Sequence, residues 1–373
     1  MRLQLTLAAA VLVSAAASGP GHADGTLAMR GVYYKERATR VMQPMLDGMF
    51  DAGLHGVATG HLLVDAITSA AASSGAANAA AFTERRYEGG LGYSHELGDL
   101  TLGIDGKYSS ESDYVSRYLG VRSQLQLGQK NTVLGLGGGA SFDTVSAAAS
   151  QGPLQITLRC DAMHPSETEC PLHVYAVYGS VSQVVSQSAV VGVSVDVSAL
   201  RGDQSNPYRQ AIVGETLVAE RHPTSRTREA FAATARYHVA DTGTTLVGAY
   251  RYYRDDWQVH AHTPELRVVQ EIGFDADASL RYRYYTQDGA YFYKTRYPPD
   301  DAAMTQLVSD DVKLSSFTGH TVEAKLGVLG EAFSLPGLWA GARFETIVEY
   351  IIQHNRFGNA VVAHVALTLP FSY

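Results

Sequence analysis

Hydrophobic residues alternate with small or polar ones along most of the chain, from Arg86 to the last residue. In the final segment, Val361, Val365 and Tyr373 share one face of an extended strand, and His364 lies on the other. Successive side chains of a β-strand point to opposite sides, so a period of two predicts strands with one apolar face. The pattern therefore predicts an all-β chain.

The predicted strands are long and numerous. A tilted strand that crosses a bilayer needs about 9 to 11 residues, and strands of soluble proteins usually have about 5 or 6. Repeated strands of the longer kind predict a transmembrane antiparallel up-and-down β-barrel of about 16 strands, with about 14 as the alternative. The expected strands are 26–37, 41–52, 57–67, 82–96, 99–110, 114–127, 131–144, 172–186, 188–200, 227–239, 244–255, 263–273, 277–288, 312–328, 341–353 and 361–373.

The connections between these strands alternate between short and long. Bacterial outer-membrane barrels have short periplasmic turns and long outer loops in this order. Two gaps depart from the rule, because 333–340 is long for a turn and 37–40 is short for a loop. The tight connections are 52–56, 97–98, 128–130, 187, 240–243 and 274–276, and the long ones are 68–81, 145–171, 202–226 and 289–311.

The N-terminus has the features of a secretory signal. Arg2 precedes an apolar, alanine-rich stretch, and Gly21-His22-Ala23 offers small residues where a signal peptidase cuts. We expect residues 1–23 to be removed and residues 24–373 to form one barrel domain in the bacterial outer membrane. An uncleaved N-terminal anchor is the weaker alternative, because the apolar stretch is short for a membrane span.

Composition and charge remove several other classes of protein. Arg2 is one of 29 basic residues, so the mature chain would keep 28 against 37 acidic ones, a net charge of −9. This balance argues against nucleic-acid binding, which needs clustered Lys and Arg. After residue 24 no apolar run approaches the roughly 18 residues of a membrane helix. The 22 tyrosines suit the headgroup level of a barrel, since a phenol has an apolar ring and a polar tip.

The C-terminus adds a targeting signal. Tyr373 is aromatic and follows apolar residues at every second position, as in strands that the barrel assembly machinery recognises. We therefore expect that machinery and the lipid of the outer membrane to be partners of this chain.

Several segments resemble a bacterial family known as domain of unknown function 3570. The resemblance spans essentially the whole mature chain and implies an exported outer-membrane protein without an established activity or agreed catalytic residues. It also suggests periplasmic redox proteins as partners. The segments that carry it are Tyr33 to Arg37, Leu63 to Ser69, Phe82 to Glu88, Gly92 to Gly98, Ser110 to Tyr114, Gln129 to Thr132 and Arg281 to Tyr285.

The faces opposite to the apolar ones are crowded with charge and are expected to line the lumen. An interior salt-bridge lattice that stiffens the wall is one interpretation, and an aqueous path that selects polar solutes is the other. The candidate lumen residues are Arg86, Glu88, Asp105, Lys107, Arg236, Arg251, Arg267, Glu271, Arg281, Arg283, Glu323, Lys325, Arg343 and Glu345; Asp47, Asp65, Arg122, Arg228, Glu265 and Glu349 share these faces.

No motif of a known enzyme class is present in the sequence, and we expect no catalytic, cofactor or metal site. The first functional hypothesis is a porin-like conduit for small polar solutes. A non-conducting accessory barrel that serves periplasmic redox partners is the second, and a barrel enzyme with an unrecognised site is the third.

Cys160 and Cys170 are the two cysteines, and both lie in the longest predicted outer loop. Outside the reducing cytoplasm a disulfide is the default for such a pair. A soft-metal site with Met163, His164 and His173 is the alternative.

We predict an intramolecular disulfide that closes a short loop and stabilises it locally by at most about 3 kcal/mol. Alkylation of the unreduced protein followed by mass spectrometry should label neither cysteine. Two labelled thiols would overturn the disulfide and favour the metal.

Overall fold

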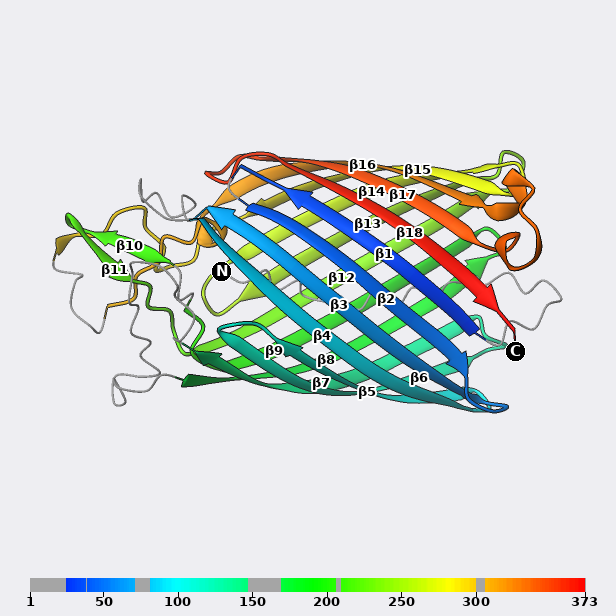
Figure 1. Cartoon of the computed structure of the whole chain (residues 1–373), viewed down its shortest axis with the longest axis horizontal. Helices are drawn as coiled ribbons and strands as arrows, with labels where there is room; N and C mark the ends of the chain where they lie inside the picture. The colour runs from blue at the N-terminus through cyan, green and yellow to red at the C-terminus, as the bar shows by residue number, and fades with distance from the viewer. Residues whose placement is uncertain are drawn as a thin grey trace.

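The structure is a computed structural model that describes residues 25–37, 39–70, 81–146, 169–205, 209–299 and 306–372. Sixteen antiparallel strands close into one barrel, and two short strands form a separate hairpin (Figure 1). The barrel strands are β1 (Gly25–Lys35), β2 (Thr39–Asp51), β3 (Gly56–Ala70), β4 (Ala81–Leu97), β5 (Leu100–Ser110), β6 (Tyr114–Leu127), β7 (Thr132–Ser146), β8 (Glu169–Ser186), β9 (Ala189–Gly202), β12 (Ser225–Val239), β13 (Thr244–Asp255), β14 (His260–Ile272), β15 (Ala276–Gln287), β16 (Phe317–Leu329), β17 (Arg343–Gln353) and β18 (Ala360–Phe371).

The first and last strands pair with each other and close the barrel. The β1–β18 ladder runs from Gly25↔Phe371 to Lys35↔Val361, so no strand of the barrel has an unpaired edge. Closure supplies each strand with backbone hydrogen-bond partners on both sides, which a spanning strand needs where no water is available. The predicted number of 16 strands is confirmed.

The alternation of short and long connections is also confirmed. At the end of the barrel where β18 finishes, the turns are short; residues 98–99, for example, join β4 to β5, and Gly98 has a φ of +64°. The opposite end carries the longer connections and the β10–β11 hairpin (Figure 1). We assign these ends to the periplasm and the exterior by the usual rule for such barrels.

The two irregular connections are where the sequence placed them. Residues 330–342 form the long periplasmic connection and contain two 3-10 turns, η4 (Gly330–Phe333) and η5 (Gly337–Trp339). The short outer connection follows Lys35. No helix in the described ranges is long and apolar enough to cross a membrane.

The largest difference from the predicted strand boundaries is at the fourteenth strand. The sequence placed the start of the fourteenth strand at residue 312, but β16 begins at Phe317. Residues Val312–Leu314 form a 3-10 turn, η3, and the carboxylate of Asp311 caps it by accepting a hydrogen bond from Lys313 N at 3.0 Å. Val312 and Leu314 are apolar because they are buried in the packed loop, and not because they face lipid on a strand of the barrel wall.

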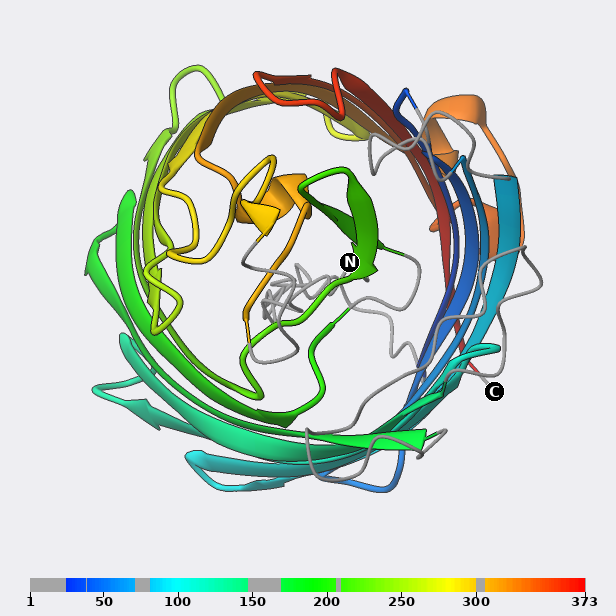
Figure 2. The ribbon, with the colours of Figure 1, turned by 90° about the vertical axis from the view of Figure 1, so that its left-hand side faces the viewer.

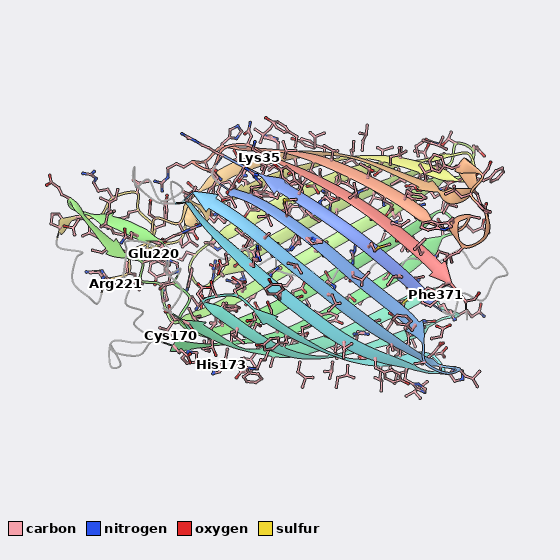
Figure 3. The ribbon with its side chains drawn as sticks, viewed as in Figure 1. Lys35, Cys170, His173, Glu220, Arg221 and Phe371 are labelled. Atoms are coloured by element: carbon pink, nitrogen blue, oxygen red, sulfur yellow. The ribbon has the colours of Figure 1, made fainter. Side chains whose placement is uncertain are left out.

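The outward face of the barrel is apolar. Leu280 on β15, Val348 on β17 and Val365 on β18 are 64%, 48% and 60% exposed, and each alternates with inward charged or polar neighbours. Exposed aliphatic side chains on every strand suit contact with lipid rather than with water. Figure 3 shows side chains projecting outward along the wall.

We predict that Val348→Arg impairs folding into lipid, because a charge at the lipid face near the bilayer centre costs roughly 2 to 4 kcal/mol. The fraction that folds into vesicles can be read from the gel shift of unboiled samples. Glu349→Gln, one residue along and on the inward face, is the matched control and should fold well. A larger defect in the control would mean that the two faces are exchanged.

Candidate functional site

The inner wall of the barrel is the candidate site, since it holds the charged residues that the sequence assigned to the lumen. Strand pairing places all fourteen candidates at inward positions. For example, Arg281 is opposite Glu323 on β16, and Glu323 is opposite Glu349 on β17. Neighbouring strands thus bring opposite charges onto the same face at about 5 Å spacing.

Arg281 is the centre of the largest group of inward charges. Its Nη1 lies 3.2 Å from Oε2 of Glu265, its Nη2 lies 3.4 Å from Oε1 of Glu349, and it forms a closer ion pair with Glu323. Arg267 lies 3.7 Å from Glu265 and 3.8 Å from Glu323. One arginine side chain, 11% exposed, therefore bridges three carboxylates from β14, β16 and β17.

A second group lies nearer the periplasmic end of the same wall. Nζ of Lys325 is 2.5 Å from Oε1 of Glu345, and Nε of Arg343 is 3.1 Å from the same oxygen. Arg343 also forms an ion pair with Asp277 of β15. Arg283, on the outer side of Arg281, is 3.5 Å from the hydroxyl of Thr321.

A chain of charges also runs across β2, β3, β4 and β5. Nδ1 of His61 lies 2.6 Å from Asp47, and its Nε2 lies 3.6 Å from Glu88, which is 3.9 Å from Lys107. The neighbouring pairs are Arg86–Asp65 at 3.0 Å and Arg122–Asp105 at 2.8 Å. Within the described part of the chain, no ion pair is formed by Arg236, Arg251 or Glu271.

The outer loops fold together over the mouth of the barrel. Viewed from the loop end, β10 (Gln210–Val213), β11 (Thr216–Ala219) and the segment after β15 lie across the opening (Figure 2). Tyr297 ties them together: its amide donates to Ile212 O at 2.9 Å, and its carbonyl accepts from Gly214 N at 2.9 Å. We call residues 209–222, 287–299 and 306–316 the lid.

Buried polar groups fix the lid. The hydroxyl of Tyr297 donates to Phe292 O at 2.6 Å and accepts from Ser309 N at 2.8 Å. Asp311 is 1% exposed and ion-paired with Arg209. Burial alone would raise the pKa of Asp311, but the charges of Arg209 and Lys313 lower it below its usual range. Such a pair holds one lid segment to the other as long as both groups stay charged.

A cavity of about 280 Å³ lies beneath the lid, between the lid and the strands. It combines cationic groups from β12, β13 and the lid with aromatic rings. Arg226 is ion-paired with Asp255 and lies 4.0 Å from the Trp257 ring centroid, whereas Arg251 stacks near Tyr253 at 5.6 Å. The charged lining residues are Arg226, Arg228, Arg251, Lys313, Asp203 and Asp311, with His222 beside them, and the aromatic ones are Tyr114, Tyr253, Trp257 and Tyr285.

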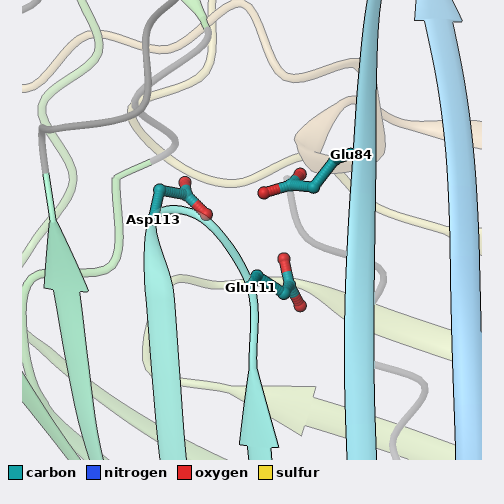
Figure 4. Close-up of side chains that lie close together, drawn as sticks. All are labelled: Glu84, Glu111 and Asp113. Atoms are coloured by element: carbon teal, nitrogen blue, oxygen red, sulfur yellow. The ribbon is translucent and has the colours of Figure 1, made fainter.

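Three carboxylates meet at the outer rim, near the start of β6. Glu84, Glu111 and Asp113 have potential ligand oxygens within 4.8 Å of one another (Figure 4). Among the described residues they are the one such group of three potential metal ligands. The hydroxyl of Ser112 donates to Glu84 at 2.9 Å, so part of this acidity is satisfied by the protein itself.

The loop that holds the cysteines is covered only in part. Cys170 is fully buried near the start of β8 and packs with Val145, Leu172 and Leu200. Cys160, Met163 and His164 lie outside the described residues, as do residues 1–23. The disulfide, the alternative metal site and the signal peptide therefore stay predictions.

The sequence did not indicate the lid or the cavity. Trp257 and Tyr297 lie in connections that were expected to be outer loops without a defined role, and Lys313 lies where the fourteenth strand was expected to begin. One signal was available, because Tyr291-Phe292-Tyr293 places three aromatic residues together in a loop. Exposed loops rarely carry such a cluster, and here Phe292 packs against Trp257 with ring centroids 5.2 Å apart.

Comparison with known proteins identifies the same fold. A family model described as "Protein of unknown function (DUF3570)" matches residues 77–356. A search of curated proteins finds no match. Among solved structures, a bacterial polysaccharide outer membrane secretin aligns with a TM-score of 0.53 at 6% identity, over 94% of this chain and 100% of that one. CdiB from Acinetobacter baumannii has a TM-score of 0.53 at 6% identity, over 92% and 60%.

OccK2 (OpdF) from Pseudomonas aeruginosa, solved in complex with glucuronate, aligns with a TM-score of 0.47 at 10% identity, over 94% of this chain and 98% of that one. The two structures with a TM-score of 0.53 show that this chain has the fold of a bacterial outer-membrane β-barrel.

We predict that Arg281→Gln destabilises the folded barrel by about 3 kcal/mol, because it leaves three inward carboxylates without their shared counter-charge. Urea unfolding in detergent, followed by tryptophan fluorescence, measures the change. Arg267→Gln is the control and should cost roughly 1 kcal/mol or less, since Arg267 is more exposed and its contacts are longer. Equal effects would show that Arg281 has no special role.

Proposed function

The chain belongs to the DUF3570 family, whose description names no function. From the barrel and its charged interior, we propose that this protein conducts small polar solutes and prefers anions at its outer mouth. The observation that carries this proposal is the cavity beneath the lid. Four basic side chains line it, against two carboxylates. Its lining therefore has an excess of positive charge at the point where a solute would enter.

The charges of the cavity differ in how far they are already neutralised. Arg226 is paired with Asp255, and Asp311 is paired with Arg209. Arg251, by contrast, has no ion pair with a described carboxylate and lines the cavity next to Tyr253 and Tyr285. A guanidinium that forms no ion pair attracts anions, and its five N–H donors suit a carboxylate or a phosphate.

The walls below the cavity are consistent with passage of polar solutes. Charges of both signs alternate between strands there, as in the Arg281 group and the Asp47–Lys107 chain. Such a wall offers both donors and acceptors to a hydrated solute, and it produces a field across the lumen rather than along it. This arrangement supports selection at the mouth and little selection deeper in the barrel.

A second candidate function is an accessory barrel that does not conduct. The packing of the lid favours it, because the buried residues Tyr297 and Ser309 donate hydrogen bonds to Ile212 O and to Glu220 of the other connection. In that case the lid would be a fixed cover and the outer surface the functional part.

Planar-bilayer recording of the purified protein separates the two candidates. We expect discrete conductance steps and a reversal potential in a KCl gradient that shows anion preference. Arg251→Gln should lower the anion-to-cation permeability ratio about five-fold, equivalent to roughly 1 kcal/mol at the cavity. Arg236→Gln, which removes an inward arginine that does not line the cavity, should change the ratio far less.

A protein that inserts and folds but gives no steps would reject the conduit and favour the accessory barrel. Steps with unchanged anion preference in Arg251→Gln would keep a conduit but remove the assigned role of the cavity.

A further inference from the structure

We propose that a row of outward-facing residues on β6, β7, β8 and β9 binds an anionic, phosphate-bearing lipid of the outer leaflet. The row consists of Arg117, Phe142, His173 and Arg201, which follow one another across the wall as register partners: Arg117↔Phe142, Phe142↔His173 and His173↔Arg201. We call it the lipid row. This proposal does not depend on conduction by the lumen.

The distribution of outward charge first points to this end of the barrel. Six Lys and Arg residues lie at outward positions of the described strands, and all six lie near the outer ends of their strands. The outward positions at the periplasmic ends of the same strands have none. The six are Lys35, Arg40, Arg85, Arg117, Arg201 and Arg254, and all are exposed.

The outward residues next to these basic groups, toward the periplasm, are apolar. Next along β6 from Arg117 toward the periplasm, the outward residue is Leu119, 56% exposed, and along β8 the outward residues after His173 are Tyr175 and Val177. The cationic groups therefore lie directly above the lipid-facing band, at the level where lipid headgroups meet the barrel. Basic side chains at this level attract acidic headgroups.

Within that level, Lys35 and Arg40 form an isolated pair of register partners, whereas the lipid row extends over four successive strands and holds two arginines with Phe142 and His173 between them. Neither Arg117 nor Arg201 forms an ion pair with a carboxylate of the described chain, although Nη1 of Arg201 donates to its neighbour Leu200 O at 2.8 Å. Arg254 differs, because it is paired with the outward carboxylate of Glu229.

The other outward carboxylate at this end, Glu169, is the first residue of β8, four residues beyond His173.

The geometry of the row suits a lipid rather than a free anion. Arg117 and Arg201 are three strand intervals apart, roughly 14 Å. Each guanidinium group can therefore bind one of the two phosphates of a large headgroup. Between them, the rings of Phe142 and His173 pack edge to face with centroids 5.5 Å apart, and Tyr175 lies 6.4 Å from Phe142. This aromatic floor would contact acyl chains or sugar rings while the arginines bind phosphate.

Figure 3 shows the position of His173 at the outside of the barrel, at the end opposite to Phe371. Lys35, labelled at the same end, is another of the six outward basic residues, and its register partner on β2 is Arg40.

The test is a titration of the full folded protein in neutral detergent with diphosphorylated lipid A, read by native mass spectrometry. Dephosphorylated lipid A of the same acyl composition is the control lipid. We expect the wild-type protein to retain the diphosphorylated lipid and to bind the control lipid much more weakly. The double variant Arg117→Gln/Arg201→Gln should bind about 30-fold more weakly, about five-fold for each arginine lost.

Arg254→Gln is the matched control, since it removes an exposed outward arginine at the same level whose charge Glu229 already balances. Its binding should stay within about two-fold of wild type. Equal binding of both lipids, or undiminished binding by the double variant, would overturn the proposal.

If the double variant fails to fold, as judged by its gel shift on boiling, the wild-type protein still decides the question. Binding should weaken strongly in about 1 M salt, where screening acts within about 3 Å. Salt-independent binding would reject electrostatic recognition of phosphate at this row.

Discussion

Closure of the backbone hydrogen-bond ladder is the constraint on which the rest of this structure depends. A strand in the hydrocarbon region has no water to satisfy its amides and carbonyls, so each strand must have two neighbours. The pairing of β1 with β18 meets this requirement for the whole chain. Closure also gives every strand an outward face, which contacts lipid, and an inward face, which lines the lumen.

The division into faces explains why charge is abundant in a membrane protein. Outward positions hold aliphatic and aromatic side chains, whereas inward positions hold ion pairs that link neighbouring strands. Arg281 shows the principle, because it reaches carboxylates on three strands and is largely buried by them. These contacts add side-chain links to the backbone ladder, and removal of one partner leaves like charges close together in a confined space.

The lid at the outer mouth is stabilised by different interactions from those of the wall. The lid has a small hydrophobic cluster of its own, formed by Ala211, Val213, Tyr297 and Val308, and buried hydrogen bonds around Tyr297. It therefore behaves as a packed unit that rests on the barrel rather than as a set of solvated loops. Its contacts with the strands create a cationic, aromatic cavity, which neither the lid nor the wall would form alone.

The sequence by itself determined the strands, their number, the inward or outward direction of side chains and the alternation of turns and loops, because each is a local consequence of a period of two and of tight turn residues. It also identified Arg281, Glu323 and Glu349 as inward residues. Tertiary structure alone decided which of them form one group, since ion pairing depends on the register between strands that are distant in sequence. It alone decided the lid, where Tyr297 meets Ile212 and Asp311 meets Arg209 through loops without periodicity. The row from Arg117 to Arg201 likewise exists only because the closed sheet places four strands side by side at one height above the apolar band.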